Sequence, residues 1–371
     1  MNKMREKLDI IWNTSLVCPW DCDICCVDAV HVTSENGQIS VKSNGLQEQE
    51  YIPKINGESI WDTATKFRQS QGLELNLEQK IQVLKNIDSD YKVKINFSGG
   101  DPLVLKETFN LIKKAYDMFG KESIQISTTG AGLSKYNPLD LVPLINKLKF
   151  SYDSAEGLYN PNRPSGYNNS NLKHASQFSK EGIFTMAETP LTIRNTKPET
   201  IALIYENLHL AEIDQVLPMR LFPVGRGMNR QQETPTSSQY LRALDTFKKL
   251  EEKYKTPTLK PQCALKYLNP HGNKENPCDL YNESVAITPN GTLTTSAWAI
   301  GPTGKPLDDA FVLGNIAENH IDDILNSPKA KYYENHINDN FGHCKIFAYF
   351  NSKKEDPLER IFDKADILYQ T

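Results

Sequence analysis

Three cysteines near the N-terminus are spaced so that their thiols can converge on one centre. Cys18, Cys22 and Cys25 lie in the segment Cys-Pro-Trp-Asp-Cys-Asp-Ile-Cys, with three and then two residues between them. Thiolates bind iron–sulfur clusters and zinc, but structural zinc is closed by four ligands and no familiar fourth ligand follows nearby. Cys26 comes next, and we expect its side chain to point away and pack.

A cubane iron–sulfur cluster has four irons and usually four thiolates. Three thiolates leave one iron open to another molecule, which is the chemical interest of this spacing. Such an iron can chelate the amino and carboxylate groups of S-adenosylmethionine, and an electron delivered through it cleaves the sulfonium. The products are methionine and a 5′-deoxyadenosyl radical that takes a hydrogen atom from a substrate. Tetrahedral zinc is the alternative.

Residues 8–230 resemble the radical S-adenosylmethionine (radical SAM) superfamily, whose signature is this triple-cysteine spacing. The resemblance implies a [4Fe–4S] cluster on Cys18, Cys22 and Cys25 and S-adenosylmethionine as the second cofactor. In this family the residue before the third cysteine borders the adenine, and Ile24 holds that place.

A glycine pair follows the expected strand 93–97, in the order Ser98-Gly99-Gly100-Asp101. Glycines at a strand end let the backbone approach a ligand closely, and a carboxylate after them can meet an ammonium group. The family carries Gly-Gly-Glu or Gly-Gly-Asp here to bind the amino group of the cofactor. The resemblance therefore implies that this segment binds S-adenosylmethionine.

Further cofactor contacts are implied at later strand ends. Thr128 lies in a segment similar to the third-strand ending of the family, and Ser151 holds the place of a serine that contacts the ribose. Arg163 lies where relatives often carry an arginine, so it either reaches the cofactor carboxylate or is a solvated loop residue. The backbone near Leu221 would border the adenine.

The last third of the chain resembles the SPASM and twitch domains that bind auxiliary iron–sulfur clusters in many relatives. Cys278, Gly291 and Ser296 follow the spacing of that domain, with serine in place of its second cysteine. The closing group of four cysteines is reduced to Cys344. The resemblance is therefore to a degenerate SPASM-like domain.

Three cysteines remain in this region, and several roles are open to them. Cys263, Cys278 and Cys344 could hold one auxiliary cluster, with His343 or Asp279 as a fourth ligand. Alternatively, the domain has lost its metal and the cysteines are small buried hydrophobic residues, which we favour. A third alternative is that Cys263 or Cys344 donates a hydrogen atom to a substrate radical, as cysteines do in peptide epimerases of this superfamily.

Short apolar runs alternate with helical patterns and must position these residues. The expected strands are 8–17, 93–97, 123–128, 148–152, 183–188 and 215–222, and the helix candidates are 77–87, 107–119 and 139–147. Asn76 is a plausible N-cap for the first helix, with Gln79 three residues on. These βα units predict an α/β fold: a partial (β/α)6 TIM-like barrel with function at the carboxyl ends of its strands.

The chain divides into a core barrel, a helical linker and a small α+β C-terminal domain, at 1–230, 231–258 and 259–371. Residues 27–76 insert into the barrel and carry a hairpin signal, with Asn36-Gly37 suited to a tight turn. This insertion is either a surface decoration or a flap over the substrate. We expect the tail, 355–370, to form one amphipathic helix.

Composition narrows the function further. The 371 residues hold 42 Lys and Arg against 46 Asp and Glu, so a chain-wide basic field for nucleic acid is excluded. The sequence shows neither a membrane span nor a signal peptide, and seven cysteines fit a reducing compartment, so we expect a cytoplasmic protein.

The sequence leaves three functions open: two are enzyme activities with different substrates, and one is not enzymatic. The first is modification of a peptide, by epimerisation or cross-linking, although no leader-peptide-binding domain precedes the barrel. The second is rearrangement, dehydrogenation or cleavage of a small molecule such as a sugar or amino acid. Both need a reductant such as flavodoxin or ferredoxin. The third is an iron–sulfur scaffold or regulatory protein without turnover.

Overall fold

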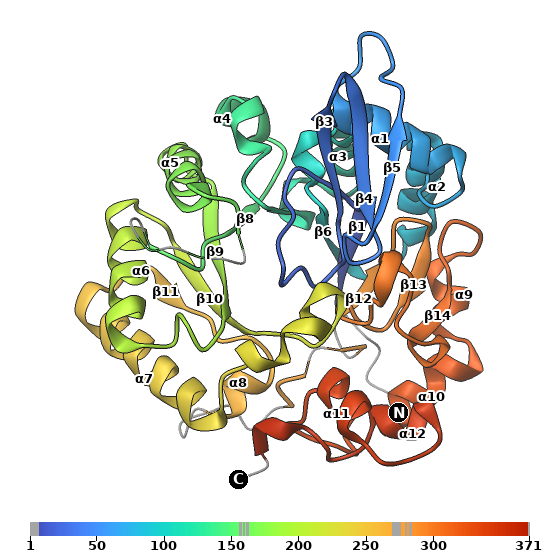
Figure 1. The fold of residues 1–371 in the computed structure, drawn as a ribbon. Helices are drawn as coiled ribbons and strands as arrows, with labels where there is room; N and C mark the ends of the chain where they lie inside the picture. The colour runs from blue at the N-terminus through green and yellow to red at the C-terminus, as the bar shows by residue number, and fades with distance from the viewer. Residues whose placement is uncertain are drawn as a thin grey trace.

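A curved sheet of parallel strands forms the centre of the protein, as a computed structural model shows (Figure 1). The structure describes residues 7–155, 158, 160, 163–268, 276–278, 280–281 and 284–369. Six strands pair in consecutive order and all run parallel: β1 (Lys7–Ser15), β6 (Lys92–Gly99), β7 (Ile124–Thr128), β8 (Lys147–Ser151), β9 (Phe184–Leu191) and β10 (Gln215–Arg220). The predicted (β/α)6 architecture is confirmed. The sheet stays open, so the barrel is partial.

Helices follow the strands and lie on the outer side of the curve in Figure 1. They are α2 (Leu77–Ile87), α3 (Lys106–Phe119), α4 (Pro138–Leu141), α5 (Tyr167–Lys180), α6 (Pro198–Leu210) and α7 (Ser237–Tyr254). The predicted N-cap is confirmed, since the Asn76 side chain accepts a hydrogen bond of 3.0 Å from the Gln79 amide. The helix expected over 139–147 is wrong: Pro143 cannot donate a helical hydrogen bond, so α4 ends at Leu141.

The strands alternate between two environments, which explains their composition. Leu8, Ile10 and Trp12 of β1 are fully buried in the main hydrophobic core. Asp9, Ile11 and Asn13, which alternate with them along the strand, line a cavity on the inner side of the sheet. Period-2 alternation thus sends apolar side chains toward the helices and mainly polar ones into the barrel.

The 27–76 insertion forms a second, smaller sheet that grows out of the cysteine loop. Its strands pair in the order β2 (Val17–Cys18), β3 (Val30–Glu35), β4 (Gln38–Ser43) and β5 (Glu48–Ile52), and α1 (Ile60–Ser70) packs on them. The expected hairpin is present, and Asn36 and Gly37 take positive φ values of 50° and 79° at its turn. Because β2 contains Cys18, this sheet is anchored at the candidate metal centre.

The C-terminal region extends the same large sheet. It contains β12 (Ser284–Ile287), β13 (Thr292–Thr294), β14 (Val312–Asn315), α9 (Ile321–Leu325), α10 (Pro328–His336), α11 (Lys345–Asn351) and α12 (Pro357–Ile361). Strand β12 pairs parallel to β1, and β13 and β14 continue antiparallel. At the opposite edge, β11 (Thr258–Leu259) pairs with β10, and α8 (Ala264–Tyr267) follows. The boundaries at 230 and 258 stay predictions.

The tail differs from the expected single helix. Helix α12 stops at Ile361, and a short 3₁₀ turn follows at Ile367–Tyr369. Between them Asp366 turns inward and pairs with Arg220 at the end of β10, through two bonds of 2.7 and 2.9 Å. The buried ion pair thus takes precedence over the continuous helix. Among the described residues, none of the helices is sufficiently long and apolar to traverse a bilayer.

The Arg220–Asp366 pair should contribute strongly to stability. Both side chains are buried, at 1% and 0% exposure, and Asp366 also accepts the Cys344 amide at 2.9 Å. We expect Asp366→Asn to lower the free energy of unfolding by about 3–5 kcal/mol, because it leaves the guanidinium buried without a countercharge. Urea unfolding measures this. The control is Glu359→Gln in the exposed Lys354 pair, with less than about 1 kcal/mol expected; equal losses would contradict the prediction.

Candidate functional site

A cavity of about 340 Å³ lies inside the barrel, at the inner face of the parallel strands. The three loop cysteines, Cys18, Cys22 and Cys25, line it at the carboxyl ends of the strands. Residues nearer the amino ends, such as Asp9 and Lys94, line it as well. The cavity therefore runs from the cysteine loop into the interior of the barrel.

The three cysteines are free thiols, and each sulfur accepts a hydrogen bond. The donors are the Trp20 amide to Cys18 at 3.4 Å, the Ala29 amide to Cys25 at 3.3 Å and the Arg163 guanidinium to Cys22 at 3.5 Å. Burial raises the pKa of Cys18 and of Cys22, so both are neutral thiols until a metal displaces their protons.

The three loop thiols are one ligand short of a closed structural zinc site. Among the described residues, no three His, Cys, Asp or Glu side chains are grouped so that they could hold a single metal ion. Ligands around one tetrahedral zinc ion lie about 3.8 Å apart, given a zinc–sulfur distance of about 2.3 Å. A cubane makes no such demand, because each thiolate binds a different iron. Cys26 also lines the cavity and packs against the main core.

The glycine pair is packed tightly against the base of the cysteine loop. The Gly100 amide donates to the Ser15 carbonyl at 2.8 Å. A Cβ at Gly99 would lie 2.1 Å from that same carbonyl oxygen, and one at Gly100 would lie 2.2 Å from the oxygen of Val17. Only glycine allows this approach, so the two sequence motifs form one site. Ser98, Gly99 and Gly100 line the cavity.

Asp101, unlike Ser98, Gly99 and Gly100, does not line the cavity. Its carboxylate is 1% exposed and accepts hydrogen bonds from the hydroxyls of Thr128 and Thr129 at 2.8 and 2.6 Å. It also accepts the amides of Leu103 and Gly132, both at 3.1 Å. Asp101 thus ties together the ends of β6 and β7. The groups of its motif that face the cavity are those of residues 98–100.

All other predicted cofactor-binding residues line the cavity. Ile24 comes from the cysteine loop, Thr128 and Ser151 from strand ends, and Leu221 from the segment after β10. The structure therefore brings together residues that lie almost 200 positions apart in sequence. Their predicted contacts to S-adenosylmethionine stay predictions.

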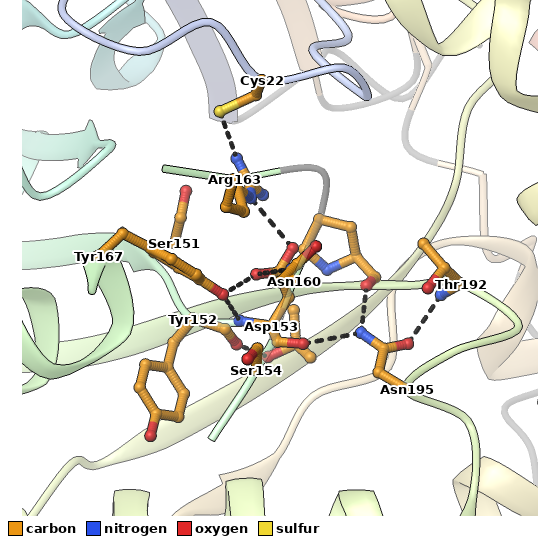
Figure 2. Close-up of polar contacts among 12 residues, drawn as sticks. Cys22, Ser151, Tyr152, Asp153, Ser154, Asn160, Arg163, Tyr167, Thr192 and Asn195 are labelled. Carbon is orange, nitrogen blue, oxygen red and sulfur yellow. Dashed lines mark hydrogen bonds and ion pairs between the residues drawn. The ribbon is translucent and has the colours of Figure 1, made fainter. Parts of the chain in front are cut away.

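Arg163 is held in place by a buried network, shown in Figure 2. Its Nε donates to Asp153 at 3.1 Å while another nitrogen points at Cys22. Asp153 also accepts the hydroxyl of Tyr167 and the side-chain amide of Asn160. Only 10% of the Arg163 side chain is exposed, so it is not a solvated loop residue. The network fixes a positive charge beside the cysteines.

Arg226 is a site residue that the sequence did not single out, although it follows the sixth strand in a Gly-Arg-Gly segment within the 3₁₀ turn Gly225–Glu233. Its Nε donates to the Cys22 carbonyl at 2.7 Å, and its backbone amide donates to the Cys25 carbonyl at 2.9 Å. Its Nη1 donates to Asp28 at 3.1 Å. Arg226 thus holds the backbone of the cysteine loop.

Asp28 connects Arg226 to the insertion and to the C-terminal region. Its carboxylate accepts the amide of Gly45 in the insertion at 3.1 Å and the amide of Thr303 in the C-terminal region at 3.0 Å. The side chains of Arg226 and Asp28 are 5% and 2% exposed. Barrel, insertion and C-terminal region therefore meet at one buried ion pair.

The remaining cysteines lie on the same cavity. Cys263, Cys278 and Cys344 line it, and so does Ser296, which stands where the SPASM pattern has cysteine. Burial, with the nearby Asp366 carboxylate, raises the pKa of Cys344 to about 12. His343 is not among the lining residues. The other suggested fourth ligand, Asp279, lies outside the described residues.

The Arg226–Asp28 pair predicts a stability effect in the protein without cofactors. We expect Arg226→Met to lower the free energy of unfolding by about 3–5 kcal/mol, since it strands the Asp28 carboxylate in the interior. The matched control is Arg230→Met, which breaks the half-exposed pair with Asp23 and should cost less than about 1 kcal/mol. Chemical unfolding of both variants is the measurement, and a loss below about 1 kcal/mol for Arg226→Met would contradict the assignment.

The tight packing of Gly100 against the cysteine loop predicts an effect on thermal stability and on cofactor binding. We expect Gly100→Ala to lower the melting temperature by several degrees and to weaken binding of S-adenosylmethionine, because its Cβ meets two backbone carbonyls of the cysteine loop. Gly301→Ala is the control, since its Cβ would find only ordinary contacts of 3.6 Å and more. Equal melting temperatures for the two variants would show that the loop is not held as described.

Comparison with known proteins agrees with this arrangement. Residues 278–346 match the SPASM family, an iron–sulfur cluster-binding domain. Streptococcus suis SuiB bound to precursor peptide SuiA has a similar structure, with a TM-score of 0.62 and 13% identity over 87% of this chain and 65% of SuiB. SuiB bound to S-adenosylmethionine gives a TM-score of 0.59 and 13% identity over 87% of this chain and 66% of SuiB.

A second similar structure is anSMEcpe with bound AdoMet and Cp18Cys peptide, with a TM-score of 0.54 and 12% identity over 88% of this chain and 82% of anSMEcpe. The present chain spans just under two thirds of the length of SuiB. No curated protein matches the chain in sequence. The fold expected from the resemblance is thus confirmed: the chain shares the fold of SuiB and anSMEcpe, and residues 278–346 match the SPASM family.

Proposed function

We propose that the protein is a radical SAM enzyme that modifies a peptide. The observation that carries this proposal is that Cys18, Cys22 and Cys25 line the same cavity as the Gly99-Gly100 strand end. When bound, a [4Fe–4S] cluster and S-adenosylmethionine supply a 5′-deoxyadenosyl radical that abstracts hydrogen. The three thiols hold the cluster and leave one iron open to the second cofactor.

The residues around the cavity have separate tasks in this proposal. The backbone of Ser98, Gly99 and Gly100 meets the methionine end of S-adenosylmethionine, and Arg163 is oriented by Asp153 toward its carboxylate. Thr128 and Ser151 face the ribose, and Ile24 and Leu221 border the adenine. Asp101 acts as a positioning residue, because its oxygens are already used by protein donors.

Exclusion of water is a further requirement, because a carbon radical reacts with whatever lies nearby. Cys18 and Cys22 are 3% and 6% exposed. The insertion and the C-terminal region are tied to the cysteine loop through Asp28. We infer that both parts close the cavity, which gives the insertion the role of a cover.

A peptide is the preferred substrate for two reasons. SuiB binds the precursor peptide SuiA and anSMEcpe binds the Cp18Cys peptide, and the C-terminal region of this chain matches the SPASM family. The reaction we propose is epimerisation or cross-linking, with flavodoxin or ferredoxin as the electron donor. A small molecule, such as a sugar or amino acid, is the second candidate, because a cavity of about 340 Å³ lies within the size range of small-molecule sites.

The C-terminal cysteines support two further assignments. Cys263 and Cys344 are candidate hydrogen-atom donors, and the raised pKa of Cys344 keeps it as the neutral thiol that such a donor must be. An auxiliary cluster on Cys263, Cys278 and Cys344 is the competing assignment, in keeping with the match to a cluster-binding family. The two assignments differ in iron content.

The test is anaerobic reconstitution followed by reduction with dithionite. We expect the wild type to release 5′-deoxyadenosine and the Cys18→Ala/Cys22→Ala/Cys25→Ala variant to release none, because the open iron is lost. Iron content should fall from about four to none for one cluster, or from about eight to four for two. A fully loaded wild type that releases no 5′-deoxyadenosine would refute the enzyme and favour a scaffold or regulatory protein.

A further inference from the structure

Lysines gather on the inner side of the barrel, away from the cysteine loop. Lys94 comes from β6 and Lys149 from β8, and both line the cavity. Lys260 follows β11, where its amide donates to the Val216 carbonyl of β10 at 3.0 Å, and it lines the cavity as well. Strands on opposite sides of the curve thus place Lys94, Lys149 and Lys260, here called the lysine cluster, around one space.

The lysine cluster has more amino groups than there are carboxylates beside it. Among the described residues, none of its three amino groups makes an ion pair or a hydrogen bond. Asp9, opposite Lys94 in the strand register, pairs with Lys7 at 3.2 Å and also attracts Lys149. Glu188 accepts the Ser127 hydroxyl at 3.3 Å, so two carboxylates, those of Asp9 and Glu188, face three lysines.

The amino groups also act on one another. The pKa of Lys149 is lowered, first by burial, with Lys260 and Lys94 adding to the effect against the attraction of Glu188. Neighbouring Lys147 has a pKa lowered to about 8 by burial and by the same three lysines. Like charges brought together in a cavity are unfavourable unless an anion joins them. A negatively charged ligand would relieve this repulsion.

The surroundings limit what that anion can be. A cavity of about 340 Å³ inside a barrel does not admit a membrane surface or a nucleic-acid duplex. Beside the lysines it is lined by Asn96, Gln125 and Ser127, whose amide and hydroxyl groups suit peptide groups, and Ser127 lies opposite Lys149 in the strand register. We therefore expect the anion to belong to a molecule that also carries peptide groups.

We propose that Lys94, Lys149 and Lys260 bind a carboxylate of the peptide substrate, so that this protein selects acidic peptides. The inference rests on the proposed function and names its substrate class. The carboxylate is either an Asp or Glu side chain or the C-terminus of the peptide. Its binding at the lysines would direct another part of the peptide toward the cysteine end of the cavity.

The experiment measures which peptides from a random pool bind to the reconstituted holoprotein under anaerobic conditions. The probes are two pools of random dodecapeptides, one with free and one with amidated C-termini, and mass spectrometry reads the bound fraction. We expect Asp and Glu to be enriched several-fold over the input in both pools if a side chain binds. If the C-terminus binds, we expect the free-acid pool to be retained several-fold better than the amidated one.

Variants of Lys94 and Lys149 test whether the preference for acidic peptides depends on the lysine cluster. We expect Lys94→Gln/Lys149→Gln to abolish the preference and to weaken binding of the selected peptides about tenfold or more, since charge-assisted hydrogen bonds are lost. Lys94→Arg/Lys149→Arg should keep the preference. The matched control is Lys113→Gln/Lys114→Gln, two exposed lysines of α3, and melting temperatures establish that each variant is folded.

Three results would overturn the inference: no peptide bound, peptides bound without preference for a carboxylate, or the same loss in the α3 control. Each differs from failure of the proposed function, which appears as no 5′-deoxyadenosine from the loaded wild type in the absence of any peptide. Retention of acidic peptides by a protein that does not cleave S-adenosylmethionine would support the inference alone.

Discussion

The loop that carries Cys18, Cys22 and Cys25 is held mainly by hydrogen bonds to its backbone carbonyl groups. Buried carbonyl groups need donors, and here they come from two other parts of the chain. Gly100 donates to Ser15, and Arg226 donates to both Cys22 and Cys25. The sulfurs accept only long hydrogen bonds of 3.3–3.5 Å from Trp20, Ala29 and Arg163, and a thiolate bound to a cluster can still accept them.

The same constraint connects regions that are distant in sequence. An arginine that spans two carbonyls and the Asp28 carboxylate must be buried, and a buried charge tolerates no loss of its partner. Asp28 in turn accepts amides from the insertion and from the C-terminal region, and Asp366 joins the tail to β10 in a similar way. The parts around the cavity are therefore fastened by charges rather than by apolar contacts alone.

Local sequence patterns were enough to predict much of the fold and part of the candidate site. The strands of the barrel and the Asn76 cap depend on neighbours in sequence, and both were found where expected. The cysteine loop and the glycine pair line one cavity, while their binding of cofactors stays a prediction. Arg226, the Arg220–Asp366 pair and the lysine cluster depend on residues more than 50 positions apart, so no local pattern reveals them. Asp101 shows the limit of motif reasoning, because its carboxylate faces protein donors and not the cavity.

The cavity separates two kinds of chemistry along the strands. At the carboxyl ends, thiols, glycine backbone and the Arg163–Asp153 network form a site suited to metal and cofactor. Nearer the amino ends, three lysines outnumber the carboxylates beside them, an arrangement suited to recognition of an anion. Placing recognition away from the radical source is physically sensible, because a charged contact can fix the position of a substrate without exposing its own groups to the radical. Catalytic and selective residues can then change independently on one scaffold.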